Sequence, residues 1–162
     1  MKLTLVEVRG REIEAVVPLL LLAEPSEPSL RWSLDHMADV VYRADLDGQP
    51  VGAATLRWQG DPAEILELAV AAEQQGRGLG RRLVELLADE ARRRGKQRLI
   101  VGTPNSSIGN IAFYQKCGLR MDHVRQDYFR YERHPVFEDG IRKRDLLVFC
   151  LDLSEESGRR RR

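Results

Sequence analysis

Two periodicities of hydrophobic and polar positions divide the chain into expected strands and helices. Residues 2–8 alternate between polar and apolar side chains, which predicts a first strand. Between residues 79 and 94, apolar side chains recur at helical spacing and leave charged pairs on the opposite face, which predicts an amphipathic helix ended by Gly95. By the same criteria we expect further strands at 41–45, 51–58, 65–70, 99–103, 124–131 and 146–153, and helices at 13–23, 30–40 and 107–117.

Turn residues separate these elements and set their order. Asp47-Gly48 between two strands predicts a hairpin, the Pro- and Ser-rich residues 24–29 predict a loop, and Pro18 predicts a kink in the first helix. The order runs from strands through strand–helix–strand–helix–strand to two closing strands, which a loop at 134–144 joins. This order indicates an α/β (α+β) fold with a partly antiparallel sheet.

Composition limits the classes of partner. The net charge of +1 offers no broad basic surface for nucleic acid. Cys117 and Cys150 form no CxxC pattern and the histidines show no ligand spacing, so we expect neither a disulfide scaffold nor a metal site. No apolar run is long enough to span a membrane, and no leader pattern is visible. We therefore expect a cytoplasmic protein without a membrane partner, with a single domain at 1–154 and a basic, disordered tail at 155–162.

The most informative segment is a glycine-rich turn between an expected strand and the helix at 79–94. It runs Gln75-Gly76-Arg77-Gly78-Leu79-Gly80-Arg81. Without Cβ atoms, main-chain amides approach an anion closely, and the helix start adds unpaired N–H groups and the positive end of its dipole. The spacing matches neither the Walker A pattern nor the GxGxxG dinucleotide pattern. We therefore expect a phosphate or pyrophosphate cradle, with a tight turn that binds nothing as the alternative.

This turn resembles that of the GNAT superfamily of acetyl-CoA-dependent N-acetyltransferases. Gln75-x-x-Gly78-x-Gly80 matches the family's (R/Q)-x-x-G-x-(G/A) motif, and residues 105–119 resemble its Y-x-K-x-G-F helix and exit. The resemblance covers residues 63–119. Within it, the sequence segments N-S-S-I and Y-Q-K-C-G resemble those of a subgroup of uncharacterised bacterial acetyltransferases. It implies acetyl-CoA (CoA) as the cofactor and a GNAT-like fold, a mixed, mostly antiparallel central sheet of about six to seven strands flanked by about four helices.

The same resemblance implies where the cofactor lies. Main-chain groups of the strand before the turn would pair with the pantetheine arm, and the turn would hold the pyrophosphate. The family has an Asn seven residues before its tyrosine, but this chain has Ser107 there, so that contact is left open and Asn105 is an alternative. The implied cofactor-binding residues are Leu68, Ala69, Val70, Gln75, Gly76, Arg77, Gly78, Leu79, Gly80, Arg81, Asn105, Ser107, Asn110 and Tyr114.

Acetyl transfer from a thioester to an amine needs a base for the amine and benefits from an acid for the leaving thiolate. Tyr114 holds the family's tyrosine position and is the expected acid; the alternative is that its ring only packs against the sheet. Glu64 and Glu67 are the candidate bases, and strand alternation places them on opposite faces unless a bulge intervenes. The alternative is that Glu64 and Glu67 are only solvated acids at the edge of the strand and that an ordered chain of water molecules accepts the proton of the amine.

These expectations together describe an enzyme, an N-acetyltransferase (an acyltransferase). It would move the acetyl group of acetyl-CoA to a primary amine of a small molecule or protein by direct attack in a ternary complex. The alternative is a non-catalytic acyl-CoA-binding regulatory or interaction module on the same fold. Residues 13–40 and 134–144 should shape the acceptor pocket. Trp32, Tyr128, Phe129 and Tyr131 either line a pocket or fill the core, and we expect most of them in the core. Family analogy leaves a homodimer open.

Overall fold

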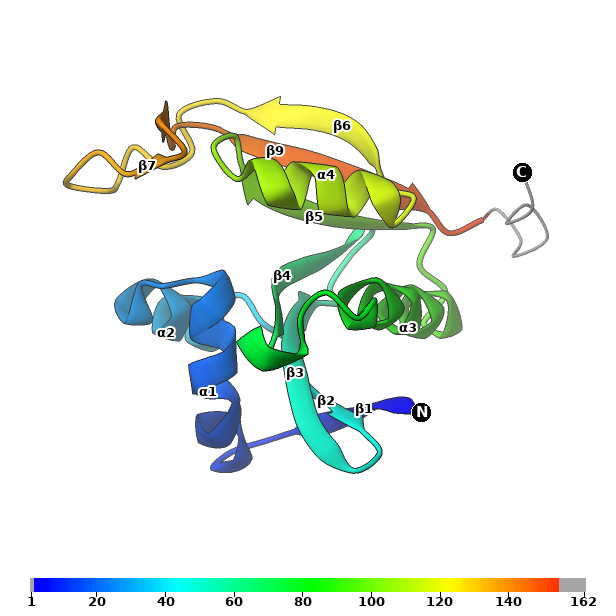
Figure 1. Ribbon diagram of the computed structural model, residues 1–162. Coiled ribbons are helices and arrows are strands. Elements are labelled where there is room, and N and C mark those ends of the chain that lie inside the picture. Colours follow the sequence, from blue (N-terminus) through cyan, green and yellow to red (C-terminus); the bar gives the residue numbers. More distant parts are fainter. Residues whose placement is uncertain (1, 155–162) are drawn as a thin grey trace.

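A computed structural model describes residues 2–154, which form a seven-stranded sheet with four α helices (Figure 1). All neighbouring strands are antiparallel except one central pair, so the expected mixed, mostly antiparallel sheet is confirmed. The expected tail at 155–162 lies outside the described residues. Across the sheet, the strands are β1 (Leu3–Val8), β2 (Val40–Leu46), β3 (Gln49–Arg57), β4 (Ala63–Val70), β5 (Arg98–Pro104), β9 (Leu146–Asp152) and β6 (Arg120–Arg125). The helices are α1 (Glu12–Ala23), α2 (Glu27–His36), α3 (Leu79–Arg93) and α4 (Ile108–Lys116), joined by a short 3-10 turn η1 (Ala72–Gln74) and a small hairpin of β7 (Phe137–Glu138) and β8 (Ile141–Arg142).

The central parallel pair divides the sheet into two arms. β4 and β5 pair only where residues 63–65 meet residues 99–101, and beyond this point the two strands separate. β1 to β4 form one arm and β5, β9 and β6 form the other, so the sheet opens like a V (Figure 1). α1 and α2 lie on one side of the first arm and α3 on its other side, while α4 lies on the second arm. The opening between β4 and β5 therefore has walls from both halves of the chain.

Apolar periodicity explains how the helices pack. In α3 the expected apolar stripe is buried, and Leu83 and Leu87 reach a core to which β1 to β5 all contribute. In α1, Val16 and Leu20 are buried against the opposite side of the first arm. Full burial of one such side chain contributes about 1.5–3 kcal/mol. Pro18 lies within α1 without ending it, so the helix continues past the residue at which a kink was expected.

The expected strand at 124–131 is wrong, because β6 starts earlier and ends at Arg125. Its pairing with β9 covers residues 120–125, and Asp127, with a φ of 53°, then turns the chain away from the sheet. Tyr128, Phe129 and Tyr131, which fell in the expected strand, lie in this turn. As a result, the aromatic side chains after β6 are placed at the opening of the V.

The second helix begins and ends earlier than the expected range of 30–40. Ser26 accepts a hydrogen bond from the Ser29 amide at 3.3 Å, which caps the start of α2 three residues upstream of Leu30. The helix ends at His36, and the chain then enters β2 at Val40. The loop expected at 134–144 contains the small β7–β8 hairpin. These shifts leave the order of the main elements unchanged.

Candidate active site

The free edge of β4 is the first part of the site. Beyond residue 65, no strand of the described chain pairs with the side of β4 that faces β5, although β4 continues to Val70. The main-chain groups of Leu68, Ala69 and Val70 therefore border the opening of the V. The Gln75 side chain donates from Nε2 to the Val70 carbonyl at 3.0 Å and holds the following turn against the strand end.

The glycine turn follows directly and leads into α3. Gly76 and Gly78 both have a φ of 78°, a left-handed conformation that other residues rarely adopt, and Gly78 is the N-cap of α3. The amides of these two glycines donate to no other described residue, and the first amides of α3 have no partner within the helix. Nothing lies within 4 Å of a Cβ added at either glycine. The turn is thus an open group of N–H donors at the positive end of a helix, which suits a pyrophosphate.

Side chains around the turn add charge and fix the helix that follows. Arg77 donates to the Gln74 side chain, and Arg81 lies 3.8 Å from Glu85; both guanidinium groups are exposed. A Cβ at Gly80 would meet the Phe113 ring at 3.1 Å, so this glycine permits close packing of α3 against α4. Leu79 is buried and anchors the start of α3. The residues expected on the turn are therefore together at one place.

Tyr114 lies on α4 and is only 7% exposed. Its ring packs against Phe113 and Phe149, with ring centroids 5.1 and 5.9 Å apart. Burial raises the pKa of the Tyr114 phenol, so the hydroxyl stays protonated over the working range of pH. The ring therefore packs as the alternative interpretation expected, and the same burial keeps the phenol in the form that a proton donor needs.

Glu64 and Glu67 come to the same side of β4 because a bulge intervenes. Glu64 pairs with Arg57 and Glu67 with Thr55, so the register shifts by one residue at Leu66. Both carboxylates are buried. Burial raises the pKa of Glu67, against the opposing effect of hydrogen bonds from Thr55 and Ser33. Glu67 therefore has the environment of a base tuned toward neutral pH.

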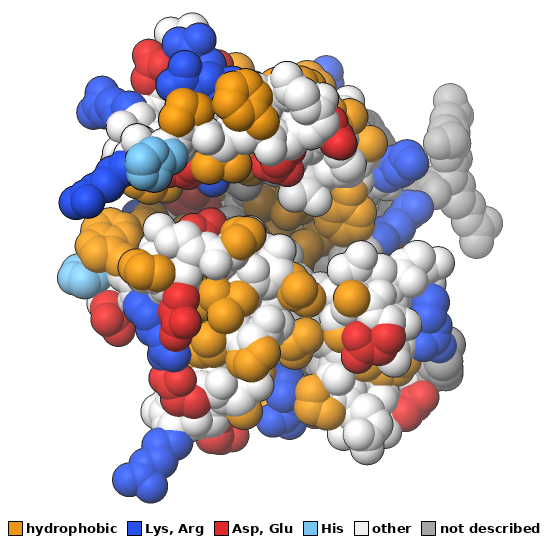
Figure 2. All heavy atoms as spheres, turned by 60° about the vertical axis from the view of Figure 1, so that its left-hand side comes forward, with side chains coloured by type: hydrophobic (Ala, Val, Ile, Leu, Met, Phe, Trp, Pro, Cys, Tyr) orange, Lys and Arg blue, Asp and Glu red, His pale blue; other side chains and the backbone are white. Residues whose placement is uncertain are grey.

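A cleft of about 1440 Å³ opens beside Glu67, and Figure 2 shows it as a hollow between the two arms. Its walls come from the end of α1, from α2, from β4 and from the turn after β6. Trp32 and Tyr131 line it and are 56% and 60% exposed, so the expectation that they lie in the core is wrong. Glu24 also lines it, and burial raises the pKa of this carboxylate. The expected acceptor region, including part of 134–144, therefore surrounds one cleft.

The polar residues near α4 have different roles. The Asn105 amide donates to the Arg142 carbonyl at 3.1 Å and accepts from the Arg144 and Asp145 amides at 2.9 and 3.0 Å, so it holds the loop before β9. The Ser107 hydroxyl donates to Glu138 at 3.0 Å and does not cap α4, although Ser107 is its N-cap residue. Ser107 and Asn110 both line the cleft.

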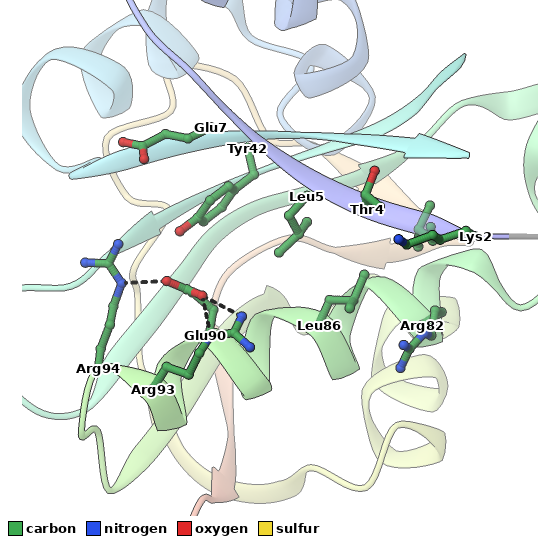
Figure 3. Close-up of a pocket in the computed structure, with 11 residues that line it drawn as sticks. Lys2, Thr4, Leu5, Glu7, Tyr42, Arg82, Leu86, Glu90, Arg93 and Arg94 are labelled. Carbon is green, nitrogen blue, oxygen red and sulfur yellow. Dashed lines mark hydrogen bonds and ion pairs between the residues drawn. The ribbon is translucent and has the colours of Figure 1, made fainter. Parts of the chain in front are cut away.

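A second cavity of about 610 Å³ lies between β1 and α3 (Figure 3). Figure 3 shows Glu90 at its lower rim, below Tyr42, between the guanidinium groups of Arg93 and Arg94. Glu90 contacts these two groups at 2.6 and 3.2 Å, and the two ion pairs lower its pKa. Because these charged groups already pair with one another, we place the functional site at the opening of the V and not here.

The splayed sheet, the open group of N–H donors at the start of α3 and the cleft beside them form the arrangement expected for an acyltransferase that uses a nucleotide carrier. The chain belongs to the GNAT family: the model of the acetyltransferase (GNAT) family matches residues 13–119. It is therefore an acetyl-CoA-dependent acyltransferase, with acetyl-CoA as the cosubstrate. Among the described residues, no helix has the length and apolar character needed to cross a membrane.

Relatives and solved structures agree with this assignment. The uncharacterised N-acetyltransferase YvbK of Bacillus subtilis is 34% identical over 137 residues, which cover 83% of this chain and 87% of that protein. A B. subtilis acetyltransferase in complex with CoA is 32% identical, with a TM-score of 0.81 and coverage of 93% of this chain and 99% of that one. A GNAT family acetyltransferase from Elizabethkingia anophelis with acetyl-CoA bound is 28% identical, with a TM-score of 0.79 and coverage of 93% and 97%.

Proposed function

We propose that the chain transfers the acetyl group of acetyl-CoA to a primary amine of a small molecule or protein, by direct attack in a ternary complex. One observation carries this proposal: β4 bears both the free main-chain edge at residues 68–70 and the buried Glu67 that faces the cleft. An acyl carrier paired with that edge and an amine in the cleft would therefore meet on the same strand. The expected cytoplasmic location and the homodimer stay predictions.

The residues at the opening of the V are suited to hold the cosubstrate. The amides of the turn and of the first turn of α3 would bind the pyrophosphate, with Gln75 fixing the turn and Arg77 and Arg81 adding positive charge. Residues 68–70 would pair with the pantetheine arm as a neighbouring strand does. Ser107 and Asn110 would border it from α4, and Asn105 would support the loop behind them.

Acetyl-CoA supplies an activated thioester, whose carbonyl carbon forms a bond to the amine nitrogen while the carbon–sulfur bond breaks. Glu67 would accept the proton that the amine loses, directly or through one water, and Tyr114 would donate a proton to the departing thiolate. A main-chain N–H near Val70 would stabilise the charge on the carbonyl oxygen. We assign the base to Glu67 because Glu64 contacts two arginines and does not line the cleft.

Release of free thiol from acetyl-CoA, measured with a panel of primary amines, tests the proposal. We expect amine-dependent release that Glu67→Gln lowers by about 100-fold or more, the usual contribution of a general base. Binding of acetyl-CoA by this variant should stay unchanged, because Glu67 lies outside the turn. Tight acetyl-CoA binding with no release for any amine would instead favour the non-catalytic acyl-CoA-binding module.

A further inference from the structure

Two guanidinium groups from opposite arms of the V converge on one buried carboxylate beside the cleft. Arg57 ends β3 in the first arm and Arg125 ends β6 in the second. Arg57 Nη2 lies 3.4 Å from one oxygen of Glu64, and Arg125 Nη1 lies 3.9 Å from the other. Both arginines line the cleft, whereas Glu64 does not.

The two arginines carry more charge than the one carboxylate between them neutralises. Among the described residues, no second carboxylate forms an ion pair with either arginine, and Arg125 Nε donates a hydrogen bond to His123. The side chains of Arg57 and Arg125 are 45% and 37% exposed, while that of Glu64 is 10% exposed. Two positive charges therefore share one buried negative charge, and both ion-pair distances are longer than an ideal charge-assisted contact. An anion entering the cleft would meet two donors that are only partly satisfied.

The register of the sheet places Arg57 beside the proposed base. Arg57 is paired with Glu64, and Thr55, two residues earlier on the same strand, is paired with Glu67. Two residues along a strand span about 7 Å and bring side chains to the same face. Arg57 and Glu67 therefore lie side by side on one wall, at a spacing that a small molecule with both an amine and an acid group spans, and Arg125 approaches Glu64 from the other arm.

We propose that the acceptor is an amine that carries a carboxylate a few bonds away, such as an amino acid, with the carboxylate held between Arg57 and Arg125. This inference rests on the proposed function and names the substrate class for that site. Trp32 and Tyr131 at the mouth of the cleft would cover an apolar side chain of the acceptor. A diamine held by Glu24 is the competing possibility, but the positive charge of Lys143 already acts on Glu24.

The test compares each amino acid with its own amide, which keeps the amine and side chain but lacks the negative charge. At saturating acetyl-CoA we expect kcat/KM for the acid to exceed that for the amide by about 10-fold or more, as hydrogen bonds to a charged group imply. Arg57→Gln and Arg125→Gln should each raise KM for the acid by about 10-fold and remove most of the preference, with kcat changed by less than about threefold. Arg57→Lys should retain part of the preference, because it retains the charge.

Arg120→Gln is the matched control, because Arg120 lies on the same strand as Arg125 but does not line the cleft. It should leave both the preference and acetyl-CoA binding unchanged. Equal rates for acids and amides, or a preference for diamines, would overturn the inference and leave the acetyltransferase function standing.

Binding of the same acids and amides to the CoA complex, measured by calorimetry, separates the inference from the proposed function. A preference for acids in binding, without turnover, would support the anion site and remove the enzymatic proposal. Absence of any such preference in both binding and turnover would refute the anion site.

Discussion

The left-handed conformation of Gly78 allows the proposed anion-binding role of the turn to be tested by adding a single methyl group. Alanine in this conformation costs about 1–2 kcal/mol. For a chain of this size, each 1 kcal/mol lowers Tm by about 2–4 °C. Gly78→Ala should therefore fold, with a Tm lowered by about 2–8 °C. The added methyl group has no protein atom within 4 Å and would extend into the space proposed for the pyrophosphate.

Loss of one hydrogen bond to a charged group, worth about 1.5–3 kcal/mol, corresponds to about 10- to 150-fold weaker binding of acetyl-CoA. Gly95→Ala is the matched control: Gly95 has a φ of 73°, has nothing within 4 Å of an added Cβ, and lies just after the opposite end of α3. Calorimetric titration should show weaker binding for Gly78→Ala only, although both variants lose similar stability. Unchanged affinity in Gly78→Ala, or equal losses in the two variants, would refute the proposed cradle.

Three further substitutions test the acid, the base and the core. Tyr114→Phe should lower kcat by about 100-fold, the low end for a general acid, while acetyl-CoA affinity stays within about twofold; thiol release and calorimetry measure the two, and an unchanged kcat would remove Tyr114 from the mechanism. Because burial raises the pKa of Glu67, kcat/KM should rise with pH through a value above the ordinary range for Glu, and Glu67→Gln should lose that acidic limb in the pH profile. Thr103→Val should raise the unfolding free energy by about 1 kcal/mol, because the Thr103 hydroxyl is buried without a partner among the described residues; a lower Tm would argue against this.

Local sequence patterns predicted which helices and strands form more accurately than the residues at which they begin and end. The stripe of α3 and the glycine after it are visible in the sequence because both follow from neighbouring residues. The end of β6 is not visible there, because it depends on where β9, more than twenty residues later, stops pairing. The cap of α2 has a local signal in Ser26 followed by Pro28, which apolar periodicity alone passes over.

In the site too, features set by neighbouring residues could be predicted, whereas features set by contacts between distant residues could not. The glycine turn is encoded within one short segment, so its conformation followed from the residue types. The pairing of Arg57 and Arg125 with Glu64 joins three strands and has no sequence signal in a single chain. Asn105 was an alternative contact for the cofactor, and that contact stays a prediction. Its amide also holds the loop before β9, a role that depends on contacts nearly forty residues away and has no local sequence signal.

One irregularity in β4 accounts for two features that the proposed chemistry needs. The last pair between β4 and β5 joins Ile65 to Val101, and the bulge follows at Leu66. A bulge bends its strand and increases the local twist, which turns the rest of β4 away from β5 and leaves its edge free. The same extra residue reverses the alternation of side chains, so that Glu67 faces α2 and the cleft on the side that Glu64 also faces. Without the bulge at Leu66, strict alternation would turn the Glu67 side chain toward α3. β4 and β5 could then continue to pair beyond Ile65.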